Sequence, residues 1–349
     1  MTTAMAARFR EQARACGQLG SPMYAELLGR AAEDIDAKGQ VATVLRGHEH
    51  DPGPSALALR LAGSVHRLVL ERRAEALALF YPSVGGRWDL TAAWSAFEAL
   101  LVDRGEEVRA WLDRPPQTNE VGRAAALVGG LLRLDPAHRL PVRLFEIGAS
   151  GGLNLRADRF RFRHQDGSTH GPPDSPVRLD DAWAGAPLTA WPDLEIVERV
   201  GGDVSPVDVR STEGRLLLTA YCWPDQPTRL ARLRAAFEVA AQHAAEVRRV
   251  DAVSLVEDIE LATGTTTVLW HSVMWQYLSR LDQDAVTERI SRLGAAARED
   301  APFAHLSLEP DRRATAEDHQ FLVVLEQWPV GGRRVLGTAA PHGLPTTWE

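Results

Sequence analysis

A glycine-rich turn carries the strongest chemical signal in the sequence. Residues 144–155 read Leu-Phe-Glu-Ile-Gly-Ala-Ser-Gly-Gly-Leu-Asn-Leu, an apolar run followed directly by glycines. This change predicts a buried strand that ends at the turn and a helix that begins after it. Gly148, Ser150 and Gly152 are small residues at alternate positions, so the backbone can turn tightly and approach a ligand closely. Backbone N–H groups at the start of the helix would then face polar or anionic groups of that ligand.

This turn resembles the first motif of class I S-adenosylmethionine-dependent methyltransferases. In that motif an acidic residue and then Gly-x-Gly-x-Gly surround the methionine and ribose parts of the cofactor. Ser150 stands here in place of the middle glycine, so a small side chain is retained. The resemblance implies an S-adenosylmethionine site formed by an acid, the turn itself and the asparagine after it: Glu146, Gly148, Ala149, Ser150, Gly151, Gly152 and Asn154.

The same letters also spell Gly-x-Ser-x-Gly, the pattern of a nucleophile elbow. Ser150 would then be the nucleophile of a serine hydrolase, and a later acid and histidine would complete a triad. The sequence offers candidates for both partners: Asp251 or Asp258, and His271, His305 or His319. Hydrolases of this fold have several strands before the elbow, whereas the residues before position 141 predict helices. A third interpretation is a structural turn that binds nothing.

Two downstream aspartates fit a nucleotide-type cofactor. Arg199–Pro206 reads Arg-Val-Gly-Gly-Asp-Val-Ser-Pro and resembles the second-strand pattern of the methyltransferases, in which the acid, here Asp203, holds the ribose hydroxyls. The usual separation from the glycine turn is roughly twenty residues. An insertion at about 157–192 accounts for the greater separation here. Asp251 follows a helical pattern and would meet the adenine. The alternative for each is an aspartate in a surface turn or loop.

The residues expected to act on a methyl acceptor come from several segments. His271 follows a predicted strand, where open α/β sheets bind ligands, and its imidazole suits general-base work. Asn119 and Glu120 lie four and three residues before Arg123 and share a helix face with it. We expect Glu120 to act with His271, and Asn119 and Arg123 to bind the acceptor. The alternatives are a structural histidine and a capped, solvated helix end. Two aromatic residues complete the expected acceptor site: Trp223 and Tyr277.

The predicted elements form two regions. Before residue 141, apolar residues recur at helical spacing, and we expect helices at 4–16, 23–38, 55–80, 91–102, 106–112 and 119–134. After it, strands are expected at 142–147, 195–200, 216–222, 250–253, 266–270 and 304–308, with helices at 228–247 and 282–297. Segments 321–328 and 334–339 predict an antiparallel hairpin.

These elements predict an α/β fold. Residues 141–349 are expected to form a Rossmann-like, methyltransferase-type and mainly parallel sheet with a terminal antiparallel hairpin. Residues 1–140 are expected to form an N-terminal all-helical lobe that serves as a lid and helps to bind the substrate.

Composition narrows the function classes. The chain has 349 residues and a net charge of −8, which argues against duplex nucleic acid as a partner and leaves a small molecule. The one lysine, Lys38, lies outside any Gly-Lys-Ser/Thr motif, which excludes a P-loop NTPase. The two cysteines, Cys16 and Cys222, exclude a disulfide framework and a zinc–thiolate site. With no long apolar run for a membrane span, they indicate a cytoplasmic protein. No metal site is expected, and the patterns specify neither the methyl acceptor nor the oligomeric state.

An ordered set of motifs resembles an uncharacterised bacterial family, common in actinobacteria, known as domain-of-unknown-function family 2332. The resemblance covers nearly the whole chain and implies one conserved unit rather than a fusion, without implying an activity. The motifs are Thr118–Arg123, Glu146–Leu155, Trp223–Gln226, Thr267–Ser272, His342-Gly343 and Trp348.

Overall fold

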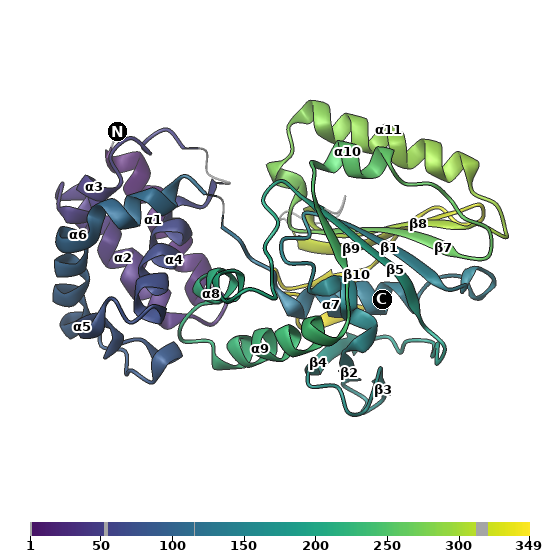
Figure 1. Ribbon diagram of the computed structural model, residues 1–349, viewed down its shortest axis with the longest axis horizontal. Coiled ribbons are helices and arrows are strands. Elements are labelled where there is room, and N and C mark those ends of the chain that lie inside the picture. Colours follow the sequence, from purple (N-terminus) through teal and green to yellow (C-terminus); the bar gives the residue numbers. More distant parts are fainter. Residues whose placement is uncertain (1, 52–54, 115, 312–319) are drawn as a thin grey trace. The chain divides into compact units, whose positions relative to one another are not determined.

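The computed structural model describes residues 2–51, 55–114, 116–311 and 320–349. The chain divides into two compact units (Figure 1). Unit 1 comprises Met1–Thr118 and Thr212–Ala231, and unit 2 comprises Asn119–Ser211 and Arg232–Glu349. The helix that follows Arg123 packs on the sheet of unit 2 and belongs to that unit.

Unit 1 is built from helices around an apolar core. Its helices are α1 (Thr2–Gln18), α2 (Pro22–Asp36), α3 (Gln40–Val44), α4 (Leu57–Leu70), α5 (Glu75–Ala78), α6 (Leu90–Leu112) and α8 (Thr212–Ala220). Ser21 caps α2 by accepting a hydrogen bond from the N–H of Tyr24 (3.2 Å), and Asp89 caps α6 through the N–H of Ala92 (3.1 Å). Buried apolar side chains from these helices form one cluster, to which Trp223 also belongs.

Two sequence predictions in unit 1 are wrong. The pattern at 55–80 predicts one helix, but α4 ends at Leu70 and α5 begins at Glu75, because Arg72 takes a left-handed φ of 59°. The pattern at 216–222 predicts a strand, but most of these residues lie in α8, which buries Leu218. A short apolar run fits a buried strand and a buried helix equally well, so periodicity could not decide.

Unit 2 is organised around one mixed sheet of 11 strands. In spatial order these are β3 (Thr169–His170), β2 (Arg161–His164), β4 (Arg178–Gly185), β11 (Thr346–Trp348), β10 (Arg333–Ala339), β9 (Gln320–Trp328), β8 (Phe303–Asp311), β7 (Thr266–Ser272), β1 (Val142–Ile147), β5 (Ile196–Asp203) and β6 (Glu246–Arg249). The run β6-β5-β1-β7-β8 is parallel, and β8, β9 and β10 are antiparallel neighbours. The mixed α/β class is therefore confirmed, as is the terminal hairpin, formed by β9 and β10.

The order of the parallel strands defines a switch point. From β1 the chain adds β5 and β6 on one side and β7 and β8 on the other. The same reversal occurs in doubly wound sheets, which bind ligands beyond the carboxyl ends of the strands at that point. The carboxyl ends of β1 and β7 flank it here.

Helices cover both faces of this sheet (Figure 1). On one face, α10 (Ala252–Glu257) and α11 (Arg280–Ala296) share an apolar cluster with Phe145, Leu269 and Phe303. On the other lies α7 (Ala124–Leu131), so close that a Cβ on Gly130 would stand 2.5 Å from Cδ2 of Leu306. The helix α9 (Pro227–Gln242) begins in unit 1 and continues in unit 2.

Two further segments of unit 2 differ from the sequence prediction. The pattern at 250–253 predicts a strand, but the strand is β6 and the chain then enters α10 at Ala252, because Asp251 caps that helix. The excursion at about 157–192 supplies β2, β3 and β4, which extend the sheet beyond β11. No helix in the described part of the chain combines the length and apolarity that crossing a membrane requires.

Candidate functional site

The glycine turn follows β1 with alternating left-handed residues. The φ angles are 67° at Gly148, 53° at Ser150 and 65° at Gly152. A non-glycine residue in this region carries roughly 1–3 kcal/mol of backbone strain. The segment after the turn is a 3-10 helix, Asn154–Arg159, rather than the expected α-helix. The turn is therefore a tight, strained structure with no α-helix N-terminus behind it.

Hydrogen bonds from the β5 end hold the turn. The N–H groups of Gly148 and Ala149 both donate to the carbonyl of Gly202 (2.9 and 3.1 Å). The N–H of Ser150 donates to Oδ2 of Asp203 (2.8 Å). Asp203, expected to hold ribose hydroxyls, thus already has one carboxylate oxygen on the turn.

The segment before α7 completes this arrangement. Oδ1 of Asn119 accepts a hydrogen bond from the N–H of Leu153 (2.9 Å), and the carbonyl of Glu120 accepts one from Nδ2 of Asn154 (3.2 Å). The expectation that N–H groups of the turn stand free for an anionic ligand is therefore not met at these positions. Carbonyl, carboxylate and amide oxygens of the protein already accept from them.

Two acceptor atoms beside the turn have no donor among the described residues. They are Oε2 of Glu146 and Oδ1 of Asn154, and the two residues are 3% and 2% exposed. Burial raises the pKa of Glu146 to about 8, an effect that the nearby Trp270 and the positive charge of Arg123 only partly offset. A buried acceptor without a donor costs free energy unless a ligand or water supplies the hydrogen bond.

The chain after β7 closes over the opposite side of the switch point. Val273 has a left-handed φ of 52°, a conformation rare for a β-branched residue. Its neighbour Met274 covers the glycine turn, since a Cβ on Gly148 would stand 3.1 Å from Cβ of Met274. Arg123 ties this segment to the C-terminal part of the chain, because Nη1 donates to the carbonyl of Ser272 (3.2 Å) and Nε to that of Pro341 (3.0 Å).

A histidine–glutamate–histidine network holds the same segment. Nδ1 of His271 lies 2.8 Å from Oε1 of Glu309, and Nε2 lies 3.0 Å from Nε2 of His305. The same Glu309 oxygen accepts from the N–H of Met274 (3.0 Å). Burial, together with the nearby His271, lowers the pKa of His305 well below its ordinary value. His271 stacks on Trp275 with ring centroids 5.0 Å apart. Both ring nitrogens of His271 are therefore engaged.

Glu146 and His271, at the ends of neighbouring strands, lie on different faces of the sheet. Glu146 pairs with Trp270, which pairs with Leu306 on the α7 side. His271 pairs with Ile147, a member of the cluster under α10 and α11. Glu120 directly precedes the 3-10 turn that leads into α7. His271 and Glu146 therefore point to opposite faces of the sheet, and Glu120 contacts Asn154 beside the turn through its backbone carbonyl.

The remaining expected site residues are more scattered. The side chain of Asp251 caps α10 by accepting from the N–H of Ser254 (2.7 Å) and is exposed. Tyr277 is 52% exposed. Trp223 belongs to unit 1, where its ring lies 6.0 Å from that of Tyr24. These three residues are not brought to the glycine turn by the contacts within unit 2.

The hydrolase interpretation needs a histidine that can accept the proton of Ser150, and two of its three candidates belong to the network that holds Met274. His271 and His305 bond to each other and to Glu309. The third histidine candidate, His319, lies outside the described residues.

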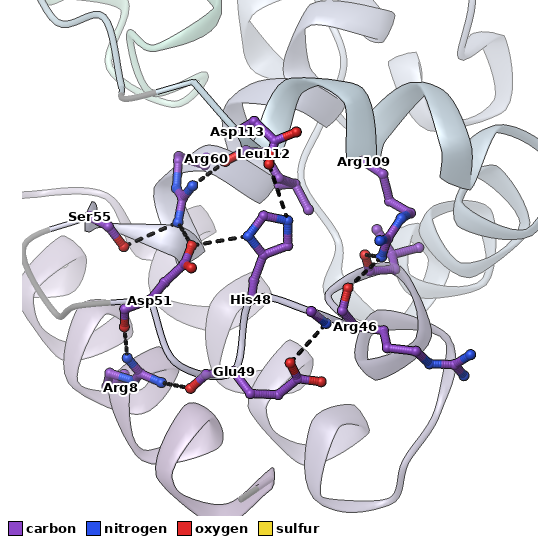
Figure 2. Close-up of polar contacts among 12 residues, drawn as sticks. Arg8, Arg46, His48, Glu49, Asp51, Ser55, Arg60, Arg109, Leu112 and Asp113 are labelled. Carbon is purple, nitrogen blue, oxygen red and sulfur yellow. Dashed lines mark hydrogen bonds and ion pairs between the residues drawn. The ribbon is translucent and has the colours of Figure 1, made fainter.

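A second polar cluster lies in unit 1 and is formed by side chains around Asp51 (Figure 2). Nδ1 of His48 lies 3.0 Å from Oδ2 of Asp51, and Arg60 bonds to the same carboxylate. Hydrogen bonds from Arg60 hold the pKa of Asp51 below its ordinary value. Arg8 donates to the carbonyl of Glu49 (2.7 Å). Because Oδ2 of Asp51 and Oε2 of Glu49 already accept from protein donors, the arrangement is typical of a structural clamp.

No three His, Cys, Asp or Glu side chains of the described residues are grouped as a metal site. Sequence reasoning missed Val273, Met274 and the positioning contribution of Glu309. A signal for them existed, because Glu309 follows the predicted strand at 304–308 and Met274 follows that at 266–270.

Comparison with known proteins gives one match. A model of the family described as "Uncharacterized protein conserved in bacteria (DUF2332)" matches residues 6–348. The chain belongs to this family, and the match spans both units. No curated protein and no solved structure matches the chain.

Proposed function

We propose that this member of the bacterial family binds S-adenosylmethionine at the turn between β1 and the 3-10 helix and transfers its methyl group to a small molecule. The strand order supports the proposal, because the turn lies at the switch point of the parallel strands. The acid at the end of β5, Asp203, contacts the turn directly. These features suit a cofactor that lies across the ends of β1 and β5.

The proposal depends mainly on which hydrogen-bonding groups beside the glycine turn lack a protein partner. Glu146 and Asn154 each present a buried acceptor without a donor, while Gly148, Ala149 and Ser150 already use their N–H groups. A phosphate would need donors, so a dinucleotide fits this turn poorly. S-adenosylmethionine carries an ammonium group, ribose hydroxyls and a sulfonium charge, and it has no phosphate. Its hydrogen-bond donors match the two acceptors that lack a donor among the described residues.

The residues of the turn fit the group as follows. Oε2 of Glu146 and Oδ1 of Asn154 would accept hydrogen bonds from it, and Asp203 would accept from hydroxyls through its remaining lone pairs. When bound, S-adenosylmethionine supplies an electrophilic methyl group. The chain contributes alignment, which accounts for much of the rate enhancement in such transfers. His271 acts here as a positioning residue, because Glu309 links it to the backbone of Met274.

Calorimetric titration with S-adenosylhomocysteine tests the proposal. We expect binding near micromolar strength, about −8 kcal/mol, and much weaker binding of NAD⁺. Gly148→Ala should weaken it at least tenfold, since the new Cβ would crowd Met274 in a left-handed backbone. The matched control is Gly167→Ala, whose φ is 90° and whose added Cβ meets nothing within 4 Å.

Four outcomes separate the alternatives. Binding that is lost in Gly148→Ala and retained in Gly167→Ala supports the proposed site. No binding at millimolar ligand by the folded protein overturns it. Binding without methyl transfer to any of a set of small metabolites leaves a ligand-binding protein on this fold and overturns the transfer step. Ser150 labelling by a fluorophosphonate would instead favour the hydrolase.

A further inference from the structure

A hollow lined by arginines lies in unit 2, at the opposite end of the parallel strands from the glycine turn. Its volume is ≈ 490 Å³, within the range of roughly 300–1,000 Å³ that small-molecule sites occupy. Its walls come from the end of α7, the segment before β1 and the loop between β9 and β10. These segments meet at the amino ends of the parallel strands, whereas the glycine turn lies at the carboxyl ends.

The charge around this hollow is strongly unbalanced. The lining has a net charge of +3, from four arginines and one acidic residue: Arg133, Arg139, Arg333, Arg334 and Asp135. Arg333 also forms ion pairs with two acids outside the lining, Asp311 (3.4 Å) and Glu326 (3.9 Å). Burial, together with the charge of Arg334, lowers the pKa of Arg133. The positive charge of Arg133 is therefore disfavoured in this environment, and an anion in the hollow would stabilise it.

Two guanidinium nitrogens of Arg133, which lines the hollow, have no protein acceptor in the described part of the chain. Nε and Nη2 of Arg133 are buried without a hydrogen-bond partner among the described residues. Arg334 is exposed, donates to the carbonyl of Arg133 (3.2 Å) and forms no ion pair with a described acidic residue. Arg139 is held in place by the carbonyls of Leu132 (2.7 Å) and Ala190 (3.0 Å).

We propose that this hollow is a binding site for a small phosphorylated molecule. Guanidinium groups bind phosphate in a bidentate manner, and two or more arginines around one cavity suit a ligand with more than one negative charge. The size of the hollow suits a ligand of about the size of a mononucleotide. The site is independent of the glycine turn, since no residue that lines the hollow belongs to that turn.

Pyrophosphate and AMP titrated into the full chain at low ionic strength are the probes. We expect saturable binding that Arg334→Gln weakens at least tenfold and Arg333→Gln/Arg334→Gln weakens further; both side chains are exposed, so folding should persist. The matched control is Arg280→Gln, which removes the same charge from an exposed residue of α11 and should change affinity less than twofold. S-adenosylhomocysteine affinity should not change in any of these variants.

Two results would overturn the proposal. One is equal weakening by Arg334→Gln and Arg280→Gln, which would indicate a response to net charge alone. The other is binding of an oligonucleotide that tightens with its length while AMP and pyrophosphate do not bind, which would indicate a nucleic-acid surface.

Discussion

The two ends of the parallel strands in unit 2 offer opposite hydrogen-bonding groups. At the carboxyl ends of the parallel strands, Glu146 and Asn154 present acceptors that lack donors. At the amino ends, Arg133 and Arg334 present donors without an acidic partner. Both sites lie at ends of the same set of parallel strands, so the difference does not come from separate folds.

This contrast shows how backbone hydrogen bonds decide what a site can bind. The glycine turn would offer N–H donors if they were free, but Gly202, Asp203 and Asn119 accept from them. What remains is buried acceptor atoms, which suit a ligand that carries hydrogen-bond donors. At the amino ends of the strands, Arg139 donates to carbonyls that follow α7. Among the described residues, the groups left without a protein partner there are guanidinium donors, which carry positive charge.

The largest expected effect is on the pH dependence of stability at the carboxyl edge. Glu146 has a folded pKa of about 8 against an ordinary value of 4.5. Between these values the folded state holds a proton that the unfolded state has lost, so this group makes stability fall as pH rises through that window. At roughly 1.4 kcal/mol for each pKa unit, the contribution amounts to several kcal/mol.

Urea unfolding of the wild type and of Glu146→Gln at about pH 5 and about pH 8 measures this contribution. We expect the stability of the wild type relative to the variant to decrease between the two. Glu326→Gln serves as a control, since Glu326 is only partly buried and its pKa is raised less. Parallel pH profiles for the wild type and Glu146→Gln would show that the buried carboxyl is not protonated as inferred.

The next prediction compares how salt changes the affinity of each of the two sites for its ligand. Pyrophosphate affinity at the arginine hollow should fall about tenfold between roughly 50 and 300 mM salt, because exposed charges are screened over a Debye length near 10 Å. S-adenosylhomocysteine affinity should change less than twofold, because Glu146 and Asn154 are buried. Calorimetry of both ligands across this salt range makes the comparison. An equal salt response of the two ligands would remove the distinction between the edges.

The smallest effect concerns the network behind the turn. Glu309→Gln should weaken S-adenosylhomocysteine binding only a few-fold, because it loosens Met274 without removing an acceptor from the ligand. Hydrogen exchange at the Met274 amide should become faster, which distinguishes a positioning residue from one that touches the ligand. His305→Asn is the companion variant, and unchanged exchange in both would contradict the proposed link.

Local signals predicted part of the fold and part of the site. The apolar run at 142–147 is β1, and the glycines after it form the turn, because both depend on neighbouring residues. The strands β2 to β4 escaped prediction, since their pairing depends on β11 near the other end of the chain. Asp203 was identified from the Gly-Gly-Asp-Val-Ser-Pro pattern around it, whereas Glu309 was not predicted as a site residue. Its contact with His271 arises from the parallel pairing of β7 and β8.

The sequence by itself determined the α/β class, the position of the glycine turn and a helical N-terminal region, because these follow from periodicity and small residues within short windows. Tertiary structure alone decided which groups stay free. Pairing of β1 with β5 brings Gly202 and Asp203 to the turn and uses its N–H donors, and alternation across the sheet separates His271 from Glu146. Hydrogen-bond saturation depends on residues far apart in the chain, so no local pattern specifies it.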